Sequence, residues 1–500
     1  ATTLELARAV AREVAELPIE HASYQLSTTY TAMVPPALRS ELGMFYTPPA
    51  LTDRLLDLAE EQGVKWQTAR VLDPACGGGA FLLPVAMRIR RALATKSPAQ
   101  QLRTINRNLC GFEVDPFAAW LTQAWLEIGL ADLLCAAGQS LQPIVRVCDT
   151  LKQEPKGILY DLVIGNPPYG RLSLSPDQRK KFKRSLYGHA NLYGVFTDIA
   201  LRWASPSGVI AYLTPTSFLA GEYFKCLRSL LAREAAPAAI DFVNARKGVF
   251  EDVLQETMLA IYRKSAKRSR TAVHYLTVNS DASGHVSRAG HFSLPKDPSA
   301  PWLAPRGPEH QALVERLASM KHRLADWGYT VSTGPLVWNR HKPQLRRAKG
   351  KGTFPLVWAE AIAGPGEFVH RAEKRNHEPY FKTEEGDDWL KVKVPCVLLQ
   401  RTTAKEQARR LIAAELPQSF IDRHGAVVVE NHLNMIRPIG SKKPKVTPAV
   451  LSAVLNAAVV DEAFRCISGS VAVSAFELEA LPLPSPAQMA SIGKLISSGA

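Results

Sequence analysis

The stretch Val71-Leu-Asp-Pro-Ala-Cys-Gly-Gly-Gly-Ala-Phe81 decides how the first part of the chain folds. Two apolar residues precede a turn with three consecutive glycines, and an apolar helical segment, 82–93, follows it. Strand, glycine-rich turn and helix in this order predict the first βαβ unit of a doubly wound α/β sheet. The glycines at 77–79 let a ligand approach the backbone closely. Their spacing is not G-x-G-x-x-G and no Gly-Lys-Ser/Thr follows, which argues against a dinucleotide or P-loop site.

Two further apolar strands each end in acidic residues. Leu109-Cys-Gly-Phe-Glu-Val-Asp115 is the second strand, and an acid at this place in an open α/β sheet typically holds ribose hydroxyls. Glu113 is the first candidate and Asp115 the second. Val145-Arg-Val-Cys-Asp149 is the third strand, and its acid could accept a hydrogen bond from an adenine amine. Each acid alone is equally compatible with a solvated strand end.

A loop rich in hydrogen-bond acceptors follows a buried strand at Asp161-Leu-Val-Ile-Gly-Asn-Pro-Pro-Tyr-Gly170. Pro167 and Pro168 have no N–H group, so the loop cannot continue a regular ladder. It therefore offers the Asn166 side chain and the Pro167 carbonyl as fixed acceptors beside the ring of Tyr169. Two acceptors that bond both hydrogens of a planar amine, such as that of adenine, would free its lone pair to attack. A proline-stiffened strand end without function is the alternative.

A helix start precedes all of these motifs at Gly43-Met-Phe-Tyr-Thr-Pro-Pro49. Thr47 is predicted to cap the helix, with Pro48 at its first position. A helix N-terminus preceded by Tyr46 and Thr47 is also a site for a carboxylate. A helix start without any other role is the alternative.

In this order, the motifs resemble the γ arrangement of the DNA adenine-N6 methyltransferases, the group whose prototype methylates TCGA. The tetrapeptide Asn166-Pro-Pro-Tyr169 is similar to the catalytic tetrapeptide of S-adenosylmethionine-dependent amino-methyltransferases. Those enzymes act on adenine N6 in DNA or RNA, or on a glutamine amide in protein. The resemblance covers residues 40–265, and the glycine turn departs from the commoner Gly-Ser-Gly form. It implies a Rossmann-like class I methyltransferase domain with S-adenosyl-L-methionine as cofactor.

The resemblance also assigns roles to single residues, with no metal among them. The cofactor would be bound by Tyr46, Thr47, Asp73, Ala75, Gly77, Glu113, Asp149, Asn166 and Phe196. The catalytic loop would consist of Asn166, Pro167, Pro168 and Tyr169, with Phe250 stacking on the target base opposite Tyr169. A core position is the alternative for Phe196. Because an amine inside a duplex is out of the cofactor's reach, the target base would have to flip out.

The chain is basic, with 61 Lys+Arg against 46 Asp+Glu and a net charge of +15. Residues 266–500 hold 32 of these basic and 21 of these acidic residues, and so carry +11 of the excess. Such an excess favours a polyanion partner. Basic residues there are interleaved with Asn, Gln and aromatics, which suits phosphate contacts and base-edge readout. Arg340, Lys342 and Arg401 are the candidates for DNA contact, and an ordinary charged surface is the alternative.

The second half of the chain is predicted to be a mixed α+β domain. Glycines and prolines in residues 280–310 suit an irregular connection. Strand-like runs follow at 330–331, 335–338, 353–358, 392–401 and 425–430. Gln400-Arg-Thr-Thr and the tail 467–484 resemble the target-recognition domains of the same methyltransferases.

Seven scattered cysteines without a Cys-x-x-Cys pair indicate neither a disulfide framework nor a zinc site. A reducing, cytoplasmic setting fits this pattern. No apolar run approaches the ~18–20 residues that span a membrane, and the N-terminus lacks a signal-peptide pattern. We therefore expect a cytoplasmic, prokaryotic protein that associates with the nucleoid through DNA and has no membrane partner.

These observations predict a helical extension (1–40), a methyltransferase domain (41–265) and a DNA target-recognition domain (266–500). The predicted function is site-specific methylation of adenine N6 in duplex DNA, by a monomer, in a restriction–modification system that can include a separate cognate endonuclease. The alternatives are methylation of RNA adenine or protein glutamine, and a DNA-binding subunit without activity or with a fused nuclease. Only about forty residues precede the cofactor segment, too few for a nuclease domain in the ~50–200-residue range. Asp387-Asp-Trp-Leu-Lys391 lacks a preceding Pro-Asp strand and is interpreted as a solvated loop.

Overall fold

The computed structural model describes residues 3–35, 47–245, 256–264, 270–279, 283–402, 408–440, 443–467, 472–489 and 491. Two predicted site residues, Tyr46 and Phe250, lie outside these ranges. The chain forms two units. The first comprises Ala1–Phe218 and Tyr223–Ser299, and the second comprises Leu219–Glu222 and Ala300–Ala500.

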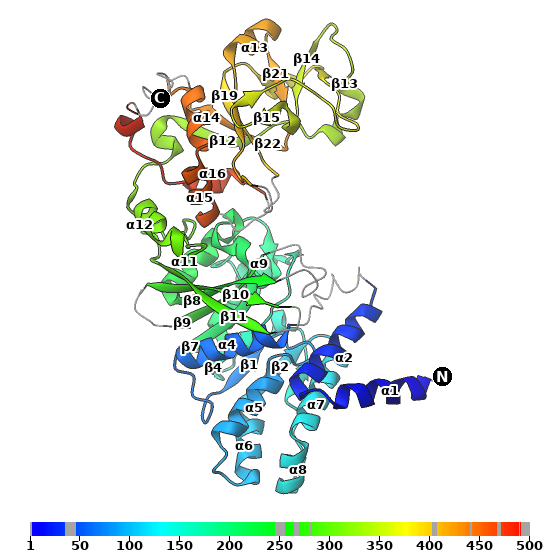
Figure 1. The fold of residues 1–500 in the computed structure, drawn as a ribbon. Helices are drawn as coiled ribbons and strands as arrows, with labels where there is room; N and C mark the ends of the chain where they lie inside the picture. Colours follow the sequence, from blue (N-terminus) through cyan, green and yellow to red (C-terminus); the bar gives the residue numbers. More distant parts are fainter. Residues whose placement is uncertain are drawn as a thin grey trace. The chain divides into compact units, whose positions relative to one another are not determined.

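A nine-stranded sheet in the order β11-β10-β8-β9-β7-β4-β1-β2-β3 forms the centre of the first unit (Figure 1). The strands are β1 (Val71–Asp73), β2 (Leu109–Glu113), β3 (Val145–Val147), β4 (Tyr160–Gly165), β7 (Ala204–Pro215), β8 (Ala235–Ala245), β9 (Thr257–Lys264), β10 (Thr271–Val278) and β11 (Gly284–Phe292). The strands from β7 to β3 are parallel, and β9 runs antiparallel to β7 and β8. Strand order reverses at β1, with β2 on one side and β4 on the other. The doubly wound fold predicted from the sequence is thus confirmed, and such a switch point is where these sheets bind ligands.

Helices cover the sheet and connect its strands. They are α1 (Thr3–Ala15), α2 (Ile19–Met33), α4 (Pro49–Glu61), α5 (Leu82–Ala92), α6 (Pro98–Asn108), α7 (Pro116–Gly129), α8 (Ala131–Ala137), α9 (Pro176–Lys181), α10 (Leu192–Trp203) and α11 (Lys225–Glu234). Side chains alternate across β4, so Leu162 and Ile164 join the core formed with α4 and α5. Within the described ranges, none of the helices combines the length and the apolar character that crossing a membrane requires.

The first unit extends beyond the boundary predicted at residue 265. Strand β10 pairs in parallel with β8, and β11 pairs antiparallel with β10. The fully buried Asp241 links β8 to β10, because its carboxylate contacts His274 Nδ1 of β10 at 2.8 Å. Glycines at 284 and 290 had suggested an irregular connection. Instead, Gly290 has a φ of +140° and lies at the irregularity where β11 pairs with β10.

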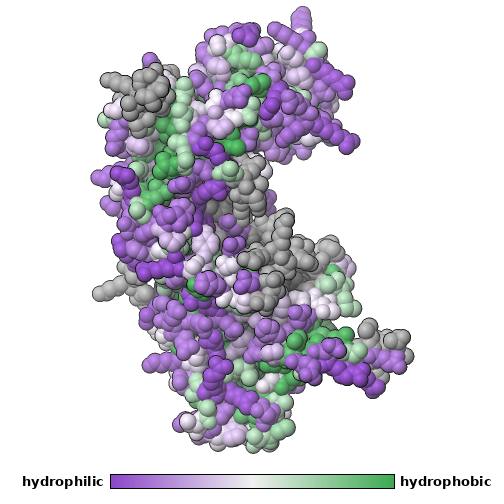
Figure 2. Space-filling model, viewed as in Figure 1, coloured by the Kyte–Doolittle hydropathy of each residue, from purple (hydrophilic) through white to green (hydrophobic). Residues whose placement is uncertain are grey.

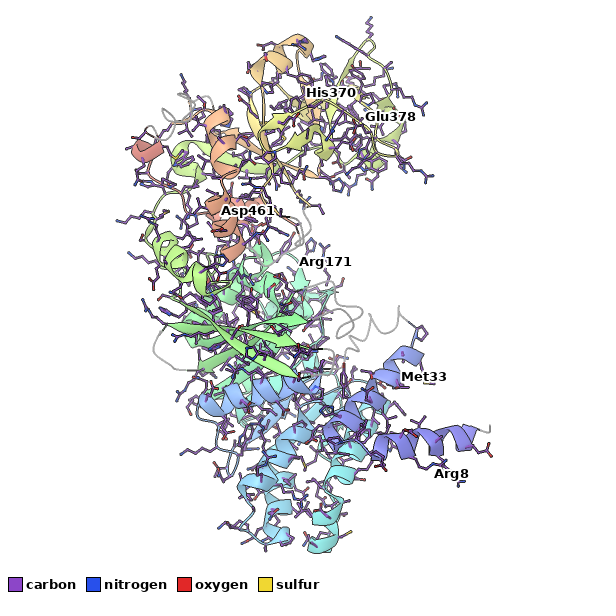
Figure 3. All side chains as sticks on the ribbon, in the orientation of Figure 1. Arg8, Met33, Arg171, His370, Glu378 and Asp461 are labelled. Carbon is purple, nitrogen blue, oxygen red and sulfur yellow. The ribbon has the colours of Figure 1, made fainter. Side chains whose placement is uncertain are left out.

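The second unit is mixed α+β, as predicted. One sheet has the order β12-β22-β19-β20 and another the order β13-β17-β14-β21-β18. Their strands are β12 (Tyr329–Thr333), β13 (Leu345–Arg346), β14 (Thr353–Val357), β17 (Tyr380–Lys382), β18 (Lys391–Val392), β19 (Cys396–Gln400), β20 (Ala413–Leu416), β21 (Val427–Val429) and β22 (Leu433–Pro438). The helices are α12 (Gln311–Ser319), α13 (Gln418–His424), α14 (Pro448–Leu455), α15 (Ala458–Ile467) and α16 (Ala475–Ala480). Asp461 of α15 accepts the backbone N–H groups of Arg410 and Leu411 at 2.7 Å, which fixes the chain just before β20 (Figure 3).

The strand predicted at 335–338 is wrong. Leu336 makes only an isolated bridge to Glu430, and a single 3₁₀ turn follows at Trp338–Arg340. Pro335 has no N–H to donate, which limits pairing at this point. The segment is therefore a loop held beside β21 by backbone hydrogen bonds at Leu336.

Candidate active site

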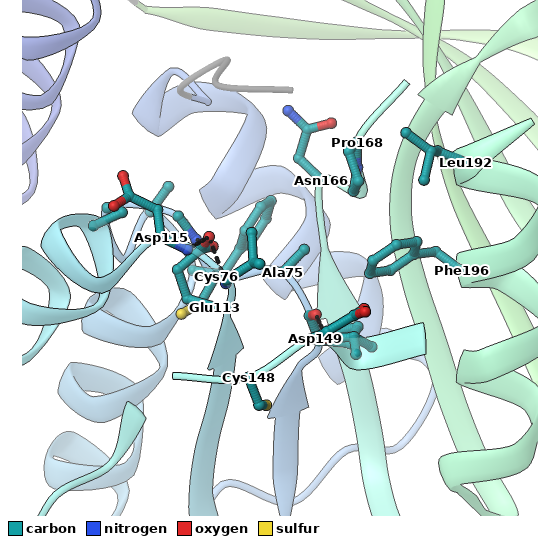
Figure 4. A pocket seen from close by; sticks show the side chains of 18 of the residues that line it. Ala75, Cys76, Glu113, Asp115, Cys148, Asp149, Asn166, Pro168, Leu192 and Phe196 are labelled. Carbon is teal, nitrogen blue, oxygen red and sulfur yellow. Dashed lines mark hydrogen bonds between the residues drawn. The ribbon is translucent and has the colours of Figure 1, made fainter. Parts of the chain in front are cut away.

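The carboxyl ends of β1, β2 and β4, with the segment that follows β3, surround a cavity of about 310 Å³ (Figure 4). Its lining includes eight of the predicted site residues, namely Thr47, Ala75, Gly77, Glu113, Asp149, Asn166, Pro168 and Phe196. These positions are far apart in the sequence. The parallel strands bring them together because their carboxyl ends share one edge of the sheet.

The glycine turn after β1 forms one wall of the cavity. Gly77 has a φ of +51°, in the left-handed region that favours glycine, and a Cβ placed there would meet no atom within 4 Å. The turn is held from behind by Thr122, whose hydroxyl donates to the Gly77 carbonyl at 2.6 Å. Gly79, at φ +86°, packs so closely on Thr122 that a Cβ would approach its side chain to 3.0 Å. The wall is thus an open backbone surface in a fixed position.

Glu113 and Asp149 stand on opposite sides of this turn (Figure 4). The Glu113 carboxylate accepts the backbone N–H groups of Gly77, Val114 and Asp115 at 2.8–2.9 Å. Burial raises the pKa of Glu113, although these three N–H groups act in the opposite direction. Asp149 accepts the N–H of Leu151 at 3.0 Å. Both acids therefore have fixed orientations, with acceptor lone pairs left for a ligand.

Asp73 lies beneath the glycine turn and does not line the cavity. It is 1% exposed, and its Oδ1 accepts the N–H of Ala75 at 3.0 Å. A Cβ on Gly165 would come within 2.7 Å of the same oxygen, so glycine there lets β4 approach β1. Direct contact with the cofactor, the role that the resemblance implies for Asp73, is not what this position favours. Its carboxyl group instead shapes the turn from below.

The pH dependence of stability tests the state of Asp73. Burial raises the pKa of Asp73 to about 8, so the folded protein holds a proton that the unfolded chain releases near its ordinary value of ~3.9. This contribution to stability is fully present below about pH 4 and is lost as pH rises to about 8. From pH 5 to pH 8, the wild type should therefore lose stability relative to Asp73→Asn, measured as urea unfolding midpoints. If the urea unfolding midpoints of the two proteins changed in parallel between pH 5 and pH 8, Asp73 would already be ionised in the folded protein.

Asn166 lies at the end of β4 and is joined to the segment before α4. Its Nδ2 donates to Thr47 Oγ1 at 3.2 Å, across 119 positions of sequence. The predicted capping role of Thr47 is wrong, because α4 starts at Pro49 with Pro48 as N-cap and no side-chain cap. Asn166 Oδ1 is buried and has no hydrogen-bond partner among the residues that the structure describes. The bond to Thr47 therefore orients the amide and leaves its oxygen as an unused acceptor.

The rest of the catalytic tetrapeptide surrounds Asn166. Pro167 is buried, and Pro168 and Tyr169 are partly exposed. The Tyr169 ring packs edge-on against Tyr193 at 6.0 Å between centroids, and its hydroxyl donates to the Leu213 carbonyl at 3.3 Å. Burial raises the pKa of Tyr169, so the phenol stays neutral at physiological pH. Tyr169 is thus a fixed, partly accessible aromatic surface rather than a proton acceptor.

Sequence reasoning missed several residues of the site. Val114, Cys148, Thr150, Leu151 and Leu192 also line the cavity. Three of them directly adjoin the predicted acids Glu113 and Asp149, and Leu151 lies two residues beyond Asp149, so their place at the same strand ends was the available signal. Tyr193 carried no such signal, because its contact with Tyr169 depends on how α10 packs.

The predicted DNA contacts lie in the second unit on neighbouring segments. Arg340 and Lys342 are exposed, and Lys342 Nζ lies 5.5 Å from the Trp338 ring centroid. Arg401 is partly exposed and donates to the Asn431 carbonyl at 3.3 Å. The N–H of Asn431 in turn bonds to the Leu336 carbonyl. Asn431 therefore links Arg401 to Leu336, four residues before Arg340.

The cavity of the first unit fits an S-adenosylmethionine-sized ligand. Its volume is at the lower end of the ~300–1,000 Å³ typical of small-molecule sites. Gly77 leaves open space for a ligand to approach the backbone, Glu113 and Asp149 offer acceptors, and Phe196 offers an apolar surface. Nucleoside hydroxyl and amine groups are the donors that such acceptors would bind.

Comparisons with known proteins agree with this geometry. Residues 148–250 match the family model described as Eco57I restriction-modification methylase. The chain is 27% identical over 470 residues to type II methyltransferase M.BsuBI of Bacillus subtilis, covering 92% of this chain and 90% of the relative. It is 24% identical over 485 residues to M.PstI of Providencia stuartii, with 92% and 90% covered.

A solved structure extends the likeness to the fold of nearly the whole chain. The type IIL restriction-modification enzyme MmeI, solved in complex with DNA, aligns with 94% of this chain and 72% of its own. The TM-score is 0.58 at 14% sequence identity, which is a likeness of fold. Over most of its length the chain is thus similar to type II methyltransferases of restriction–modification systems, and S-adenosyl-L-methionine is its cofactor.

Proposed function

We propose that the protein methylates N6 of adenine at a specific sequence in duplex DNA, with the target base rotated out of the helix. The observation that carries this proposal is the Asn166 side chain. Its Oδ1 is buried at the cofactor cavity without a hydrogen-bond partner among the described residues, while its Nδ2 is held by Thr47. A buried acceptor without a partner is rare, so a substrate donor is the expected partner.

The reaction needs an amine whose lone pair is available. S-adenosylmethionine, when bound, supplies an electrophilic methyl group on a sulfonium sulfur. Asn166 Oδ1 and the Pro167 carbonyl accept the two hydrogens of the adenine amine, which shifts the nitrogen toward tetrahedral geometry. A new N–C bond then forms as the C–S bond breaks, and the surplus proton leaves the nitrogen for water. Positioning and charge placement by these acceptors supply most of the rate.

An extruded base must be held outside its helix. Tyr169 offers a fixed ring next to Asn166, supported edge-on by Tyr193. Stacking on one aromatic ring contributes ~1–3 kcal/mol per base, which offsets part of the cost of unstacking. Phe250, proposed as the second ring, lies outside the described residues.

Duplex DNA is the proposed partner of the second unit. Arg340, Lys342 and Arg401 lie on neighbouring segments of this unit, and the region carries most of the chain's basic excess. Long basic side chains of this kind bind phosphates and read guanine edges. The likeness in fold to MmeI, which was solved with DNA, supports the same partner. Protection from a separate cognate endonuclease would be the role of the methylation.

Identifying the methylated product tests the proposal. The protein is incubated with S-adenosylmethionine carrying a labelled methyl group and with duplex DNA, RNA or protein. The DNA is then digested and its nucleosides are separated by mass spectrometry. We expect labelled N6-methyladenosine from duplex DNA alone, and sequencing of methylated DNA would then give the site. Label in N4-methylcytosine, RNA or protein glutamine would contradict the proposed substrate.

A further inference from the structure

A second, small cavity adjoins the cofactor cavity. Thr47, Gly78 and Ala80 line both, so the two cavities share a wall. The other walls come from α2 of the N-terminal extension, from α4 and from Pro84 of α5. The small cavity has a volume of about 20 Å³. This is enough for one small polar group, since a single water needs ~10–15 Å³ by the same measure.

The polar side chains around the small cavity are two carboxylates and several hydroxyl groups. Helix α2 contributes Glu20 and Tyr24, and α4 contributes Thr52 and Asp53. Thr52 is 1% exposed, and its hydroxyl has no hydrogen-bond partner among the described residues. Buried hydroxyls are normally paired, so this one indicates a missing ligand group. Two nearby carboxylates make that group a cation rather than an anion.

Arg88 reduces the negative charge on one side of this cavity only. Its guanidinium lies 3.8 Å from the Asp53 carboxylate and bonds more closely to Asp57, at 2.6 Å. These ion pairs lie on the exposed side of α4, where screening by solvent makes their electrostatic effect on the cavity small. The half-buried Glu20 is therefore the carboxylate better placed to bind a cation inside the cavity.

Apolar contacts hold α2 beside the cofactor site. Ala22 is 3% exposed and belongs to the core of the first unit. Near the other end of the helix, Tyr30 packs on Phe117 of α7 at 4.6 Å between ring centroids. Figure 2 shows hydrophobic surface where α2 and α7 meet, and Figure 3 shows Met33 at the end of α2. These contacts hold α2 in place, and so keep its residues Glu20 and Tyr24 at the small cavity.

We propose that α2 completes the cofactor site. The α-ammonium group of the methionine part of S-adenosylmethionine enters the small cavity, where Glu20, Tyr24 and Thr52 bind it. A ligand in the larger cavity reaches this place past Thr47 and Gly78. The N-terminal helices are then a part of cofactor recognition, and not only a packing element. This inference rests on the cofactor and is independent of the base that is methylated.

Binding of three ligands to the full chain without DNA tests the proposal. S-adenosylhomocysteine has the amino-acid part, its decarboxylated form keeps only the ammonium, and 5′-methylthioadenosine lacks both groups. Isothermal titration calorimetry should show that Glu20→Gln weakens binding of the first two roughly tenfold, as expected for a hydrogen bond to a charged group. Tyr24→Phe and Thr52→Val should act in the same direction, and affinity for 5′-methylthioadenosine should stay unchanged.

Matched variants separate this role from a structural one. Glu13→Gln on α1 and Gln25→Ala on the exposed side of α2 should leave all three affinities at wild-type values. Equal weakening of all three ligands by Glu20→Gln, or no weakening at all, would overturn the proposal. A loss for S-adenosylhomocysteine without a loss for its decarboxylated form would assign the cavity to the carboxylate, and would also overturn it.

Discussion

Replacing Asn166 with alanine is expected to lower the rate of methyl transfer by at least about 10²–10³-fold, the range seen when one preorganised hydrogen bond is removed from a reacting group. The change removes the buried acceptor Oδ1 and the bond to Thr47. Single-turnover transfer to duplex DNA, with enzyme in excess, measures the chemical step without product release. Affinity for S-adenosylhomocysteine should change by only about threefold, since Glu113, Asp149 and Phe196 remain.

A second substitution at the same place identifies the atom that matters. Asn166→Asp keeps an oxygen at the Oδ1 position, and the Thr47 hydroxyl can donate to the other oxygen. This variant should therefore retain measurable transfer, well above that of Asn166→Ala. Wild-type turnover in Asn166→Ala would remove Asn166 from the chemistry. Equal loss in both variants would mean that donation by Nδ2, rather than acceptance by Oδ1, is required.

Local patterns were enough to predict the ligand-binding edge of the sheet. The strands β1, β2, β3 and β4 are short apolar runs that end in glycines, acids or prolines, and each was predicted within a few residues. Strand order then follows from the rules of doubly wound sheets, so Gly77, Glu113 and Asn166 could be placed together in advance. The signal was strong because each motif combines a buried strand with the turn chemistry that ends it.

Long-range packing was not predictable in the same way. The sequence suggested an N-cap for Thr47, yet the neighbouring proline starts α4 and frees the Thr47 hydroxyl for Asn166. Strand β11 was missed because glycines within an edge strand look like breakers when the partner strand is unknown. The polar face of α2 could not be assigned a role from the sequence either, because its contact with Thr52 depends on how α2 packs.

Removing the aromatic ring at position 169 should have the second-largest effect on activity. Tyr169→Ala deletes the surface on which we propose the extruded base stacks, at a cost of ~1–3 kcal/mol, which lowers kcat/KM by about 5–150-fold. Steady-state methylation of a duplex with one target site measures this loss. Cofactor affinity should be unchanged, because Tyr169 is not among the residues that line the described cofactor cavity.

The matched variant Tyr169→Phe keeps the ring and removes only the hydroxyl, whose bond to the Leu213 carbonyl is long at 3.3 Å. Its kcat/KM should stay within a few-fold of wild type, because so long a hydrogen bond contributes near the lower end of the ~0.5–1.5 kcal/mol of a typical one. A defect in Tyr169→Phe as large as that in Tyr169→Ala would assign the function to the hydroxyl group. Full activity in Tyr169→Ala would mean that the base is held by other groups, and the ring beside Asn166 would then support only the edge-on contact with Tyr193.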